Sequence, residues 1–396
     1  MAKLNMVKAL NLALLQEMER DPDVLVIGED VGVDGGVFRV TEDLHRKFGG
    51  TRVVDSPLAE AGIIGASVGM ALYGLKPVCE IQFSGFAFQC FHQIENHVAR
   101  YRMRSQGRFG CQMVVRMPYG GGVRALEHHS ESEEQFYAHV PGLKMVIPSG
   151  PRNARALLAA AIRDPDPVIF FEAKALYHAA KEDVPDEIET MEIGRARVDR
   201  PGADLTLIAY GAMVRVAREA AEQLHAESGA EVEIVDLLTI SPLDRETVAA
   251  SVRKTGRAVV VHEAPRSFGP GAEIAASIME GAFLSLEAPV RRVTANDLPF
   301  VASPASAPTS PMCPACSRPA ARRSPSRSPI CRGSLPFRTW EKASPRRRSS
   351  RCWCARATSS GRTRPCSRSR PTRRRSRSRH RSGGGWRRST SHPGRP

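Results

Sequence analysis

The sequence predicts an α/β protein in which strands and helices alternate along the first 300 of its 396 residues. Short, wholly apolar runs such as VLVIGED (24–30) and KPVCEIQF (76–83) are typical of buried parallel strands that end in polar groups. Stretches of helical spacing, such as 61–74 and 151–164, lie between these runs. The alternation predicts a doubly wound, mainly parallel sheet.

The first predicted domain spans residues 1–185. Its opening helix, 5–19, places Met6, Leu10, Leu14 and Met18 on one stripe, which is the spacing of a helix with one buried face. The other helices of this domain are the small-residue segment 61–74 and the segment 151–164. Its predicted strands are 24–30, 76–83, 112–118, 143–148 and 167–172.

A second α/β unit is predicted over 204–300, after a linker at 186–203. The linker region is acidic and then polar, and it contains Pro201-Gly202, which disfavours regular structure. The strands expected in the second unit are 204–211, 231–240, 257–264 and 289–297. The helices expected between them are 213–228, 244–254 and 271–282.

Composition indicates a cytoplasmic protein. The body contains Cys79, Cys90 and Cys111 without a pairing pattern, so we expect reduced thiols. The N-terminal segment has no long apolar core, which argues against a secretory signal. No apolar run reaches the roughly 18 residues of a membrane span, so no membrane association is expected.

The composition changes abruptly near Phe300. Residues 301–396 hold 24 Arg and one Lys against a single acid, Glu341, and so contribute a formal charge of +24. Since the whole chain carries +15, the body carries −9. Any argument from the basic pI, such as nucleic-acid binding, therefore concerns the tail alone.

Polar and aromatic residues cluster where predicted strands end. Ligands of open α/β sheets bind beyond the carboxyl ends of the strands, so these clusters predict a site at one sheet edge. They are Glu29-Asp30, the segment Ser56 to Glu60, the segment Gln82 to Phe86, and Gly120 to Gly122 followed by His128-His129-Ser130.

Each cluster also has a simpler interpretation. Glu29 can be a solvated acid at a strand end, Glu60 a helix-start residue favoured by the helix dipole, and Phe86 a core residue. The pair His128-His129 is a poor metal site, because adjacent residues rarely point at one ion. The glycines at 120–122 lack GxGxxG spacing and a P-loop Lys. From the residues alone, the prediction stops at an α/β enzyme subunit.

A family resemblance goes further. The strings GEDVGVDGGVF, SPLAEAGIIGASVGMALYGLKPVCEIQF, GGGVRALEHHSES, PGLKMVIPS, DPDPVIFFE and KTGRAVVVHEAP occur in this order. Together they resemble the β subunit of the thiamine-diphosphate-dependent E1 component of 2-oxo acid dehydrogenase complexes, over about residues 4–300. The resemblance implies a transketolase-like pyrimidine-binding domain, a transketolase C-terminal domain, and an α2β2 heterotetramer with the active site between α and β.

The resemblance also implies residue roles. Glu60 matches the glutamate that contacts N1′ of the cofactor's aminopyrimidine, and His129 matches the active-site histidine that donates or accepts a proton, including during acyl transfer to the lipoamide of E2. Glu29, Leu58 and Ala59 match positions beside the pyrimidine. Further cofactor positions are Gln82, Phe86 (as a stacking face), Ala87, Phe88 and Gln89. Substrate positions are Phe83, Ser84, Gly85, Phe86 and His129.

Two metals follow from the resemblance. A structural monovalent cation, K⁺, would bind mostly to backbone carbonyls, at Met113, Ala161, Ile162, Asp164 and Asp166. The Mg²⁺ that binds the cofactor's diphosphate would be held by the α subunit.

Some positions depart from the family pattern. Ser56 stands where Thr is usual, and His92-Gln93 stands where Asp-Gln is frequent. Glu131 replaces a frequent Gln, and its charge is expected to raise the pKa of His129 if the two are close. The segment FFEAKALYHAAKEDVP (170–185) favours a branched-chain substrate, 2-oxoisovalerate, whereas the core strings also resemble bacterial pyruvate E1.

Three interpretations of the tail compete. An Arg/Ser-rich disordered tail could bind RNA, and the pairs Cys313/Cys316 and Cys352/Cys354 could bind zinc, although their spacing is poor. The third is a frameshift. With suitable synonymous codons, the neighbouring frame can encode RAYLPDVPRVLEA from residue 307, which resembles the terminal helix of this family. From residue 335 it can encode a segment resembling an E2 lipoyl domain, including TDKA. We interpret the tail as a frameshifted reading, with no nucleic-acid partner expected.

Overall fold

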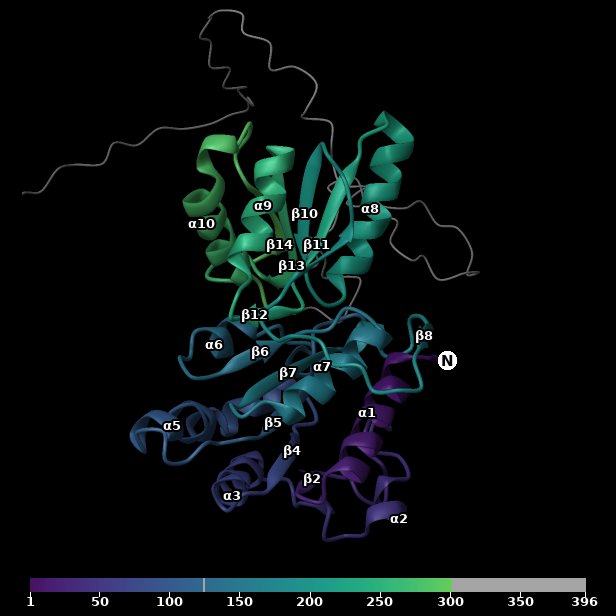
Figure 1. Ribbon diagram of the computed structural model, residues 1–396, viewed down its shortest axis with the longest axis vertical. Coiled ribbons are helices and arrows are strands. Elements are labelled where there is room, and N and C mark those ends of the chain that lie inside the picture. Colours follow the sequence, from purple (N-terminus) through teal and green to yellow (C-terminus); the bar gives the residue numbers. More distant parts are fainter. Residues whose placement is uncertain (124, 301–396) are drawn as a thin grey trace, which may run out of the picture. The chain divides into compact units, whose positions relative to one another are not determined.

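The computed structural model describes residues 1–123 and 125–300. The predicted tail, 301–396, lies outside these residues. The described part confirms the α/β prediction, since it contains two sheets whose strands are mainly parallel and are flanked by helices (Figure 1).

The first sheet has the strand order β12-β6-β7-β5-β4-β2-β3. Its neighbours pair in parallel except for β12 and β6, which are antiparallel. The central strands are buried along their whole length because helices cover both faces, which explains their unbroken apolar runs. The strands are β2 (Val24–Gly28), β3 (Val53–Asp55), β4 (Lys76–Glu80), β5 (Val114–Tyr119), β6 (Lys144–Val146), β7 (Val168–Ala173) and β12 (Thr239–Ser241).

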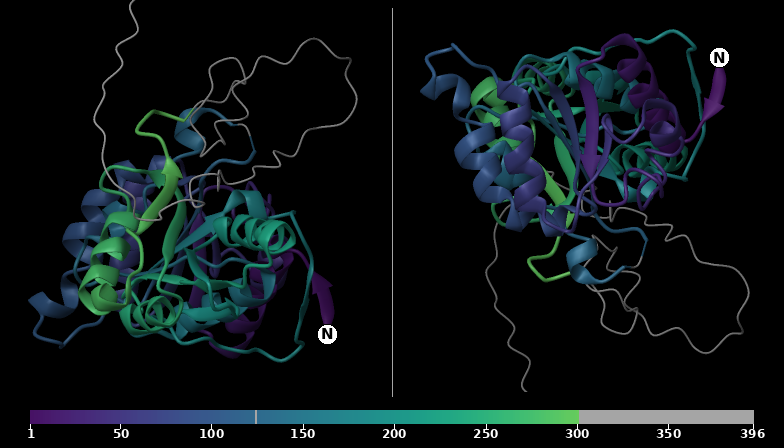
Figure 2. Two further views of the ribbon diagram at one scale, coloured as in Figure 1. Left: turned by 90° about the horizontal axis from the view of Figure 1, so that it is seen from above. Right: turned by 90° about the horizontal axis from the view of Figure 1, so that it is seen from below.

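Helices cover the two faces of this sheet. Helix α1 (Met6–Arg20) packs against α7 (Pro151–Arg163) on one face, and α3 (Glu60–Leu72) packs on β2 and β4 from the other (Figures 1 and 2). The predicted stripe of α1 is buried, and its first turn is capped by the side chain of Asn5, which accepts from the amide of Lys8. Shorter elements are α2 (Leu44–Phe48), η1 (Ser84–Gln89), α4 (Phe91–Gln93), η2 (Ile94–Val98), α5 (Tyr101–Arg104), η3 (Glu127–His129), α6 (Glu134–Ala138) and η4 (Lys174–Leu176). A small separate sheet pairs β1 (Ala2–Leu4) with β8 (Glu182–Val184).

The second sheet has the order β14-β13-β10-β11-β9. Its strands are β9 (Arg197–Arg200), β10 (Leu205–Ala209), β11 (Val232–Asp236), β13 (Ala258–Pro265) and β14 (Arg291–Ala295). Its helices are α8 (Met213–Ser228), α9 (Arg245–Thr255) and α10 (Pro270–Ala282), followed by the short turn η5 (Phe283–Ser285). Strand β9 lies inside the predicted linker and pairs antiparallel with β11, so the second sheet starts earlier in the chain than residue 204.

Strand β12 connects the two predicted domains. It follows β11 of the second sheet but pairs with β6 of the first, with Thr239 opposite Val146. Leu238, which precedes it, has a left-handed backbone (φ 57°), and its carbonyl accepts from the amide of Ile147 at 2.8 Å. The first sheet therefore includes a strand from the part of the sequence assigned to the second domain.

An ion network occupies the centre of the first sheet. The guanidinium of Arg116 donates to Glu172 at 2.7 and 3.0 Å and to Glu80 at 2.7 Å. Tyr177 donates its hydroxyl to Glu172 at 2.6 Å. Burial raises the pKa of the Glu80 carboxyl, and Arg116 opposes this shift. The network is buried, and each of its charged groups is paired with an opposite charge by hydrogen bonds, as buried charges require.

The body cysteines are free and buried. Burial raises the pKa of each of these thiols to about 12, so they act as small core residues. Within the described ranges, no helix combines the length and apolar character needed to span a bilayer.

Candidate active site

Three aromatic rings meet beyond the carboxyl ends of the strands of the first sheet. The His129 ring lies 4.5 Å from the Phe83 ring and 5.2 Å from the Phe86 ring, both edge to face. Phe83 and Phe86 are themselves 5.5 Å apart. Phe83 follows β4, Phe86 lies in η1, and His129 ends η3, so the sheet brings together side chains that are distant in the sequence.

Glu60 is the first residue of α3. Its side chain is only 6% exposed, and its Oε2 atom has no hydrogen-bond partner among the described residues. Helix α3 packs against η1, and η1 packs against η3, so Glu60 belongs to the same group of contacting elements as Phe86 and His129. Burying a carboxylate oxygen without a hydrogen-bond donor costs free energy. This oxygen is therefore suited to accept a hydrogen bond or a proton from a bound group.

Glu29 and Gln82 lie at the neighbouring ends of β2 and β4. The Gln82 amide donates to Asp30 Oδ2 at 3.4 Å. The pKa of the Glu29 carboxyl is raised, first by burial and then by the charges of Asp30 and Glu60. The charge of Glu60 is the smallest of the three causes, so the two acids influence each other only weakly.

The pKa of His129 is lowered, contrary to the expectation that Glu131 would raise it. Burial is the largest cause, and the charges of His128 and Lys174 act in the same direction. The weak opposing charge comes from Glu127. Glu131 is itself partly buried, which raises the pKa of its carboxyl and weakens any effect of its charge. The neutral imidazole is thereby favoured.

Other predicted cofactor and substrate positions differ in their exposure. Leu58 is 66% and Phe88 56% exposed, and Phe88 packs on Phe136 with ring centroids 5.8 Å apart, so neither side chain joins the aromatic group. Ala59 and Gln89 are also exposed, whereas Ala87 is fully buried. Ser84 is buried and Gly85 lies close under the His128 carbonyl, where an added Cβ would come within 2.2 Å of the carbonyl oxygen.

A set of charged residues that sequence reasoning missed lies behind His129. Lys174, only 3% exposed, donates from its ammonium to the His129 carbonyl, and Gly121 donates its amide to Glu263 Oε1 at 2.7 Å. Glu134 accepts from the Tyr210 hydroxyl at 3.3 Å. The pKa values of Glu133 and Glu134 are both raised to about 8, mainly by burial.

Lys174 and Glu263 lie near the ends of predicted strands. This position is the sequence feature that could have identified them as candidate site residues.

The predicted K⁺ positions are brought together at the end of α7. Gln112 donates from its amide to the Ile162 carbonyl at 2.9 Å, and the Met113 carbonyl accepts from the amide of Val168 at 3.0 Å. The Asp164 carboxylate already binds the ammonium of Lys144 at 2.7 and 2.8 Å. A cation here would thus depend on the second lone pairs of the carbonyls, which is compatible with a weak monovalent site.

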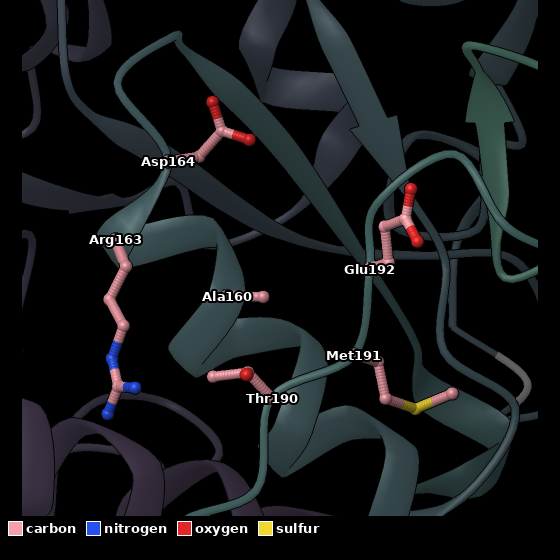
Figure 3. Close-up of a pocket in the computed structure, with 6 residues that line it drawn as sticks. All are labelled: Ala160, Arg163, Asp164, Thr190, Met191 and Glu192. Atoms are coloured by element: carbon pink, nitrogen blue, oxygen red, sulfur yellow. The ribbon is translucent and has the colours of Figure 1, made fainter.

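A surface hollow of about 460 Å³ lies beside this segment, lined by Ala160, Arg163, Asp164, Thr190, Met191 and Glu192 (Figure 3). Arg163 and Asp164 point to different sides of the end of α7 (Figure 3). Arg163 binds Glu17 and Asp164 binds Lys144, so both charges are already satisfied. The hollow is separate from the aromatic group around His129.

In the described part of the chain, no cluster of three or more His, Cys, Asp or Glu side chains is arranged to hold a metal ion. The His128 and His129 rings lie 4.3 Å apart. The two histidines thus pack ring against ring, in the same aromatic group as Phe83 and Phe86.

Comparison with known proteins identifies both domains. Residues 2–179 match the family model for the transketolase pyrimidine binding domain, and residues 194–309 match that for the transketolase C-terminal domain. A solved structure described as a split gene transketolase, inactive beta4 tetramer, superposes with a TM-score of 0.62 at 23% identity. The superposition covers 75% of this chain and 91% of the transketolase chain, and it supports only the fold assignment.

Closer relatives specify the family. The chain is 50% identical over 298 residues to the pyruvate dehydrogenase E1 component subunit beta of Acholeplasma laidlawii. It is 51% identical over 297 residues to the protein of the same name from Staphylococcus epidermidis. Both alignments cover 75% of this chain and 91% of the relative. The chain therefore belongs to the E1 β subunits of the 2-oxo acid dehydrogenases, which combine a transketolase pyrimidine-binding domain with a transketolase C-terminal domain.

Proposed function

We propose that this chain, together with an α subunit, catalyses the oxidative decarboxylation of a 2-oxo acid and the transfer of the acyl group to the lipoamide of E2. The observation that carries the proposal is the Glu60 carboxylate. It is buried, one of its oxygens has no donor among the described residues, and it lies in a group of elements that also holds His129 and Phe86.

Thiamine diphosphate fits these residues. Glu60 would face N1′ of its aminopyrimidine, and Phe86, which is partly buried, offers a ring face for stacking. When bound, this cofactor supplies the electron sink that decarboxylation requires. Its Mg²⁺ would be held by the α subunit, and a structural K⁺ would bind the carbonyls near the end of α7.

The residues of this chain would supply proton positions. Glu60 would hold a proton at Oε2 against the pyrimidine, which is favourable because burial strengthens a hydrogen bond that water does not compete for. His129 would exchange a proton with the reacting group, since its lowered pKa keeps a lone pair available at neutral pH. Phe83 and Phe86 would exclude water around the imidazole.

The substrate is proposed as pyruvate, with 2-oxoisovalerate as the second candidate. The names of the relatives at 50% and 51% identity favour pyruvate. The segment 170–185, which includes Lys174 beside His129, carries the resemblance to the branched-chain subunits. Pyruvate and 2-oxoisovalerate differ in the size of their side chains, so the substrate pocket would distinguish them by how well it packs around that side chain.

The partner is proposed to cover the edge of the sheet. Large apolar side chains are exposed close to the site in sequence and structure, at Leu58, Phe88, Val123, Leu126 and Phe136. Exposed apolar patches of this kind indicate an interaction surface. A subunit that buries them would also close the site, which is expected of an active site shared between α and β.

Co-expression with the α subunit tests the proposal. The purified complex should decarboxylate one of the two acids in the presence of thiamine diphosphate, Mg²⁺ and an artificial electron acceptor, and should acylate lipoamide when E2 is added. The ratio of kcat/KM for pyruvate and 2-oxoisovalerate decides the substrate. A well-folded complex that is inactive with both acids would contradict the proposal.

A further inference from the structure

Lys174 makes an unusual contact for a buried lysine. It lies at the start of η4, directly after β7, and donates to the backbone carbonyl of His129, 45 residues earlier in the chain. Its ammonium also lies over the Phe83 ring, 5.4 Å from the centroid. The Phe83 ring packs edge to face on the His129 ring, at 4.5 Å. Lys174 thus contacts both the backbone of His129 and the ring against which the imidazole packs.

The loop that carries His129 has few other attachments at this point. The Gly120 amide donates to the Glu131 carbonyl at 2.7 Å, and the Ser84 hydroxyl donates to the same carbonyl at 3.4 Å. Within the loop, the His129 amide donates to Leu126. The Lys174 ammonium is the contact that joins the His129 carbonyl to the end of a central strand, and so fixes it to the rigid part of the fold.

The charges around Lys174 explain why an ammonium is tolerated there. Glu263 from β13 and Glu131 and Glu133 from the His129 loop each favour its charged form, while burial opposes it and lowers the pKa of Lys174 to about 8. His129 in turn is faced by His128, Lys174 and Glu127. A cation at this position disfavours a second positive charge on the neighbouring imidazole.

We propose that Lys174 is a positioning residue, which holds the His129 loop against the end of β7 and whose positive charge disfavours protonation of the imidazole. The two effects are separable, because the hydrogen bond needs only a donor whereas the effect on the imidazole needs a positive charge. Only the kinetic consequence rests on the proposed function of His129. The protonation of His129 can be tested independently of catalysis.

The test uses the full chain in complex with its α subunit and compares K174R, K174Q and K174M. K174R keeps the donor and the charge, K174Q keeps a donor without charge, and K174M removes both. The control is K76M, since Lys76 is a partly buried lysine paired with Asp21 at the opposite end of β4. Thermal unfolding of each complex shows whether it is folded.

The first readout is the pH dependence of carbethoxylation of His129 by diethyl pyrocarbonate, followed by peptide mass spectrometry. The reagent reacts with the neutral imidazole, so the profile reports its protonation without catalysis. The profile should move to higher pH in K174Q and K174M and stay in place in K174R and K76M. Unchanged profiles in K174Q and K174M would overturn the proposal, because the charge of Lys174 would then not act on His129.

The second readout is kcat with the better of the two acids. We expect a loss of roughly tenfold or more in K174M, a smaller loss in K174Q and near-normal kcat in K174R, because misplacement of a reacting group is costly. Wild-type kcat in K174M would overturn the positioning role. If K174M does not fold, K174Q and K174R still test the charge, because both keep a donor. If all complexes are inactive, the carbethoxylation profiles still test the effect of the Lys174 charge on His129.

Discussion

The carboxylate of Glu263 accepts a hydrogen bond of 2.7 Å from the backbone amide of Gly121. Glu263 lies in β13 of the second sheet, and Gly121 follows β5 of the first, 142 residues earlier. The preceding amide, that of Gly120, donates to the Glu131 carbonyl. The second domain thereby holds the first turn of the loop that leads to His129.

Replacing Glu263 by Ala should destabilise the chain by about 1–3 kcal/mol, because the buried Gly121 amide would lose its acceptor. Glu263→Gln keeps an oxygen at the same place and should cost less. Chemical denaturation of both variants measures the difference. Glu273→Ala, which removes an exposed partner of Arg245, is the control and should change stability little. Equal stability of the Ala and Gln variants of Glu263 would contradict this account of the contact.

Glu60→Gln should abolish activity while leaving the fold intact. The amide cannot share a proton with the pyrimidine as a carboxylate does, so we expect a loss of roughly 100-fold or more in kcat. Since Glu60 Oε2 has no partner among the described residues, the substitution breaks no hydrogen bond of that oxygen. Decarboxylation by the complex and its thermal unfolding are the measurements.

Glu233→Gln provides a matched comparison, because Glu233 is a buried glutamate of the second sheet that pairs with Lys254. It should lower stability somewhat and leave kcat near normal. Near-normal kcat in Glu60→Gln would remove Glu60 from the mechanism.

The stability of the chain should fall as the pH rises from 6.5 to 8, below the range in which proton release from Lys174, whose pKa is about 8, acts in the opposite direction. The folded-state pKa of Glu134 is raised to about 8 from an ordinary 4.5, so the folded state keeps a proton that the unfolded state has lost. The stabilisation is complete below 4.5 and is lost as the pH passes through about 8. Glu133 acts in the same direction. His262 does not contribute in this pH range. Its pKa is lowered to about 4, so it reduces the stability of the folded state only below pH 6.5.

Glu134→Gln should flatten this dependence. The Gln side chain remains neutral at every pH and can still accept from Tyr210, so thermal unfolding temperatures at pH 6.5 and 8 should move closer together. Glu246→Gln, at an exposed position, should keep the wild-type slope. An unchanged slope in Glu134→Gln would show that Glu134 is ionised in the folded chain.

Arg116→Met should destabilise the first sheet by about 3–5 kcal/mol, since it leaves Glu80 and Glu172 buried without their counter-ion. Adding Glu80→Gln and Glu172→Gln to this variant should recover much of the loss, because no charge then remains in the core. Urea denaturation compares the single and triple variants. A single variant as stable as wild type would show that the network contributes nothing.

Resequencing the codons around Phe300 should reveal a frameshift. Removal of 301–396, with the in-frame terminus restored, should preserve or improve decarboxylation by the complex. Loss of function on removal would instead support the RNA-binding interpretation of the tail. An intact reading frame, together with detection of tail peptides such as those containing Trp340 by mass spectrometry, would contradict the frameshift.

The sequence was sufficient for the elements with strong periodicity. Strands β2, β4, β7 and β10 begin within one residue of their predicted starts, because wholly apolar runs leave little choice of structure. Strand β9 was assigned to the linker, because RVDR has no apolar pattern. It is held by pairing with β11 and by the ion pair between Asp199 and Arg218. Its stability comes from partners far away in the sequence.

The same reason limits the site. Glu60, Phe86 and His129 could be found because each lies within a string that resembles the family. The contact of Lys174 with the His129 carbonyl spans 45 residues, and that of Glu263 with Gly121 spans 142. Neither spacing leaves a local pattern, since each depends on which strands become neighbours.

The pairing of β12 with β6 sets a limit on how the protein can be divided. A fragment that ends in the connection before β9 would keep every helix of the first domain but lose the strand that covers β6. The backbone N–H and C=O groups along Lys144–Val146 would then form an open sheet edge, which is a template for pairing with other chains. Such a fragment should aggregate on expression, even though its aromatic group around His129 and its buried Glu60 are all encoded within it.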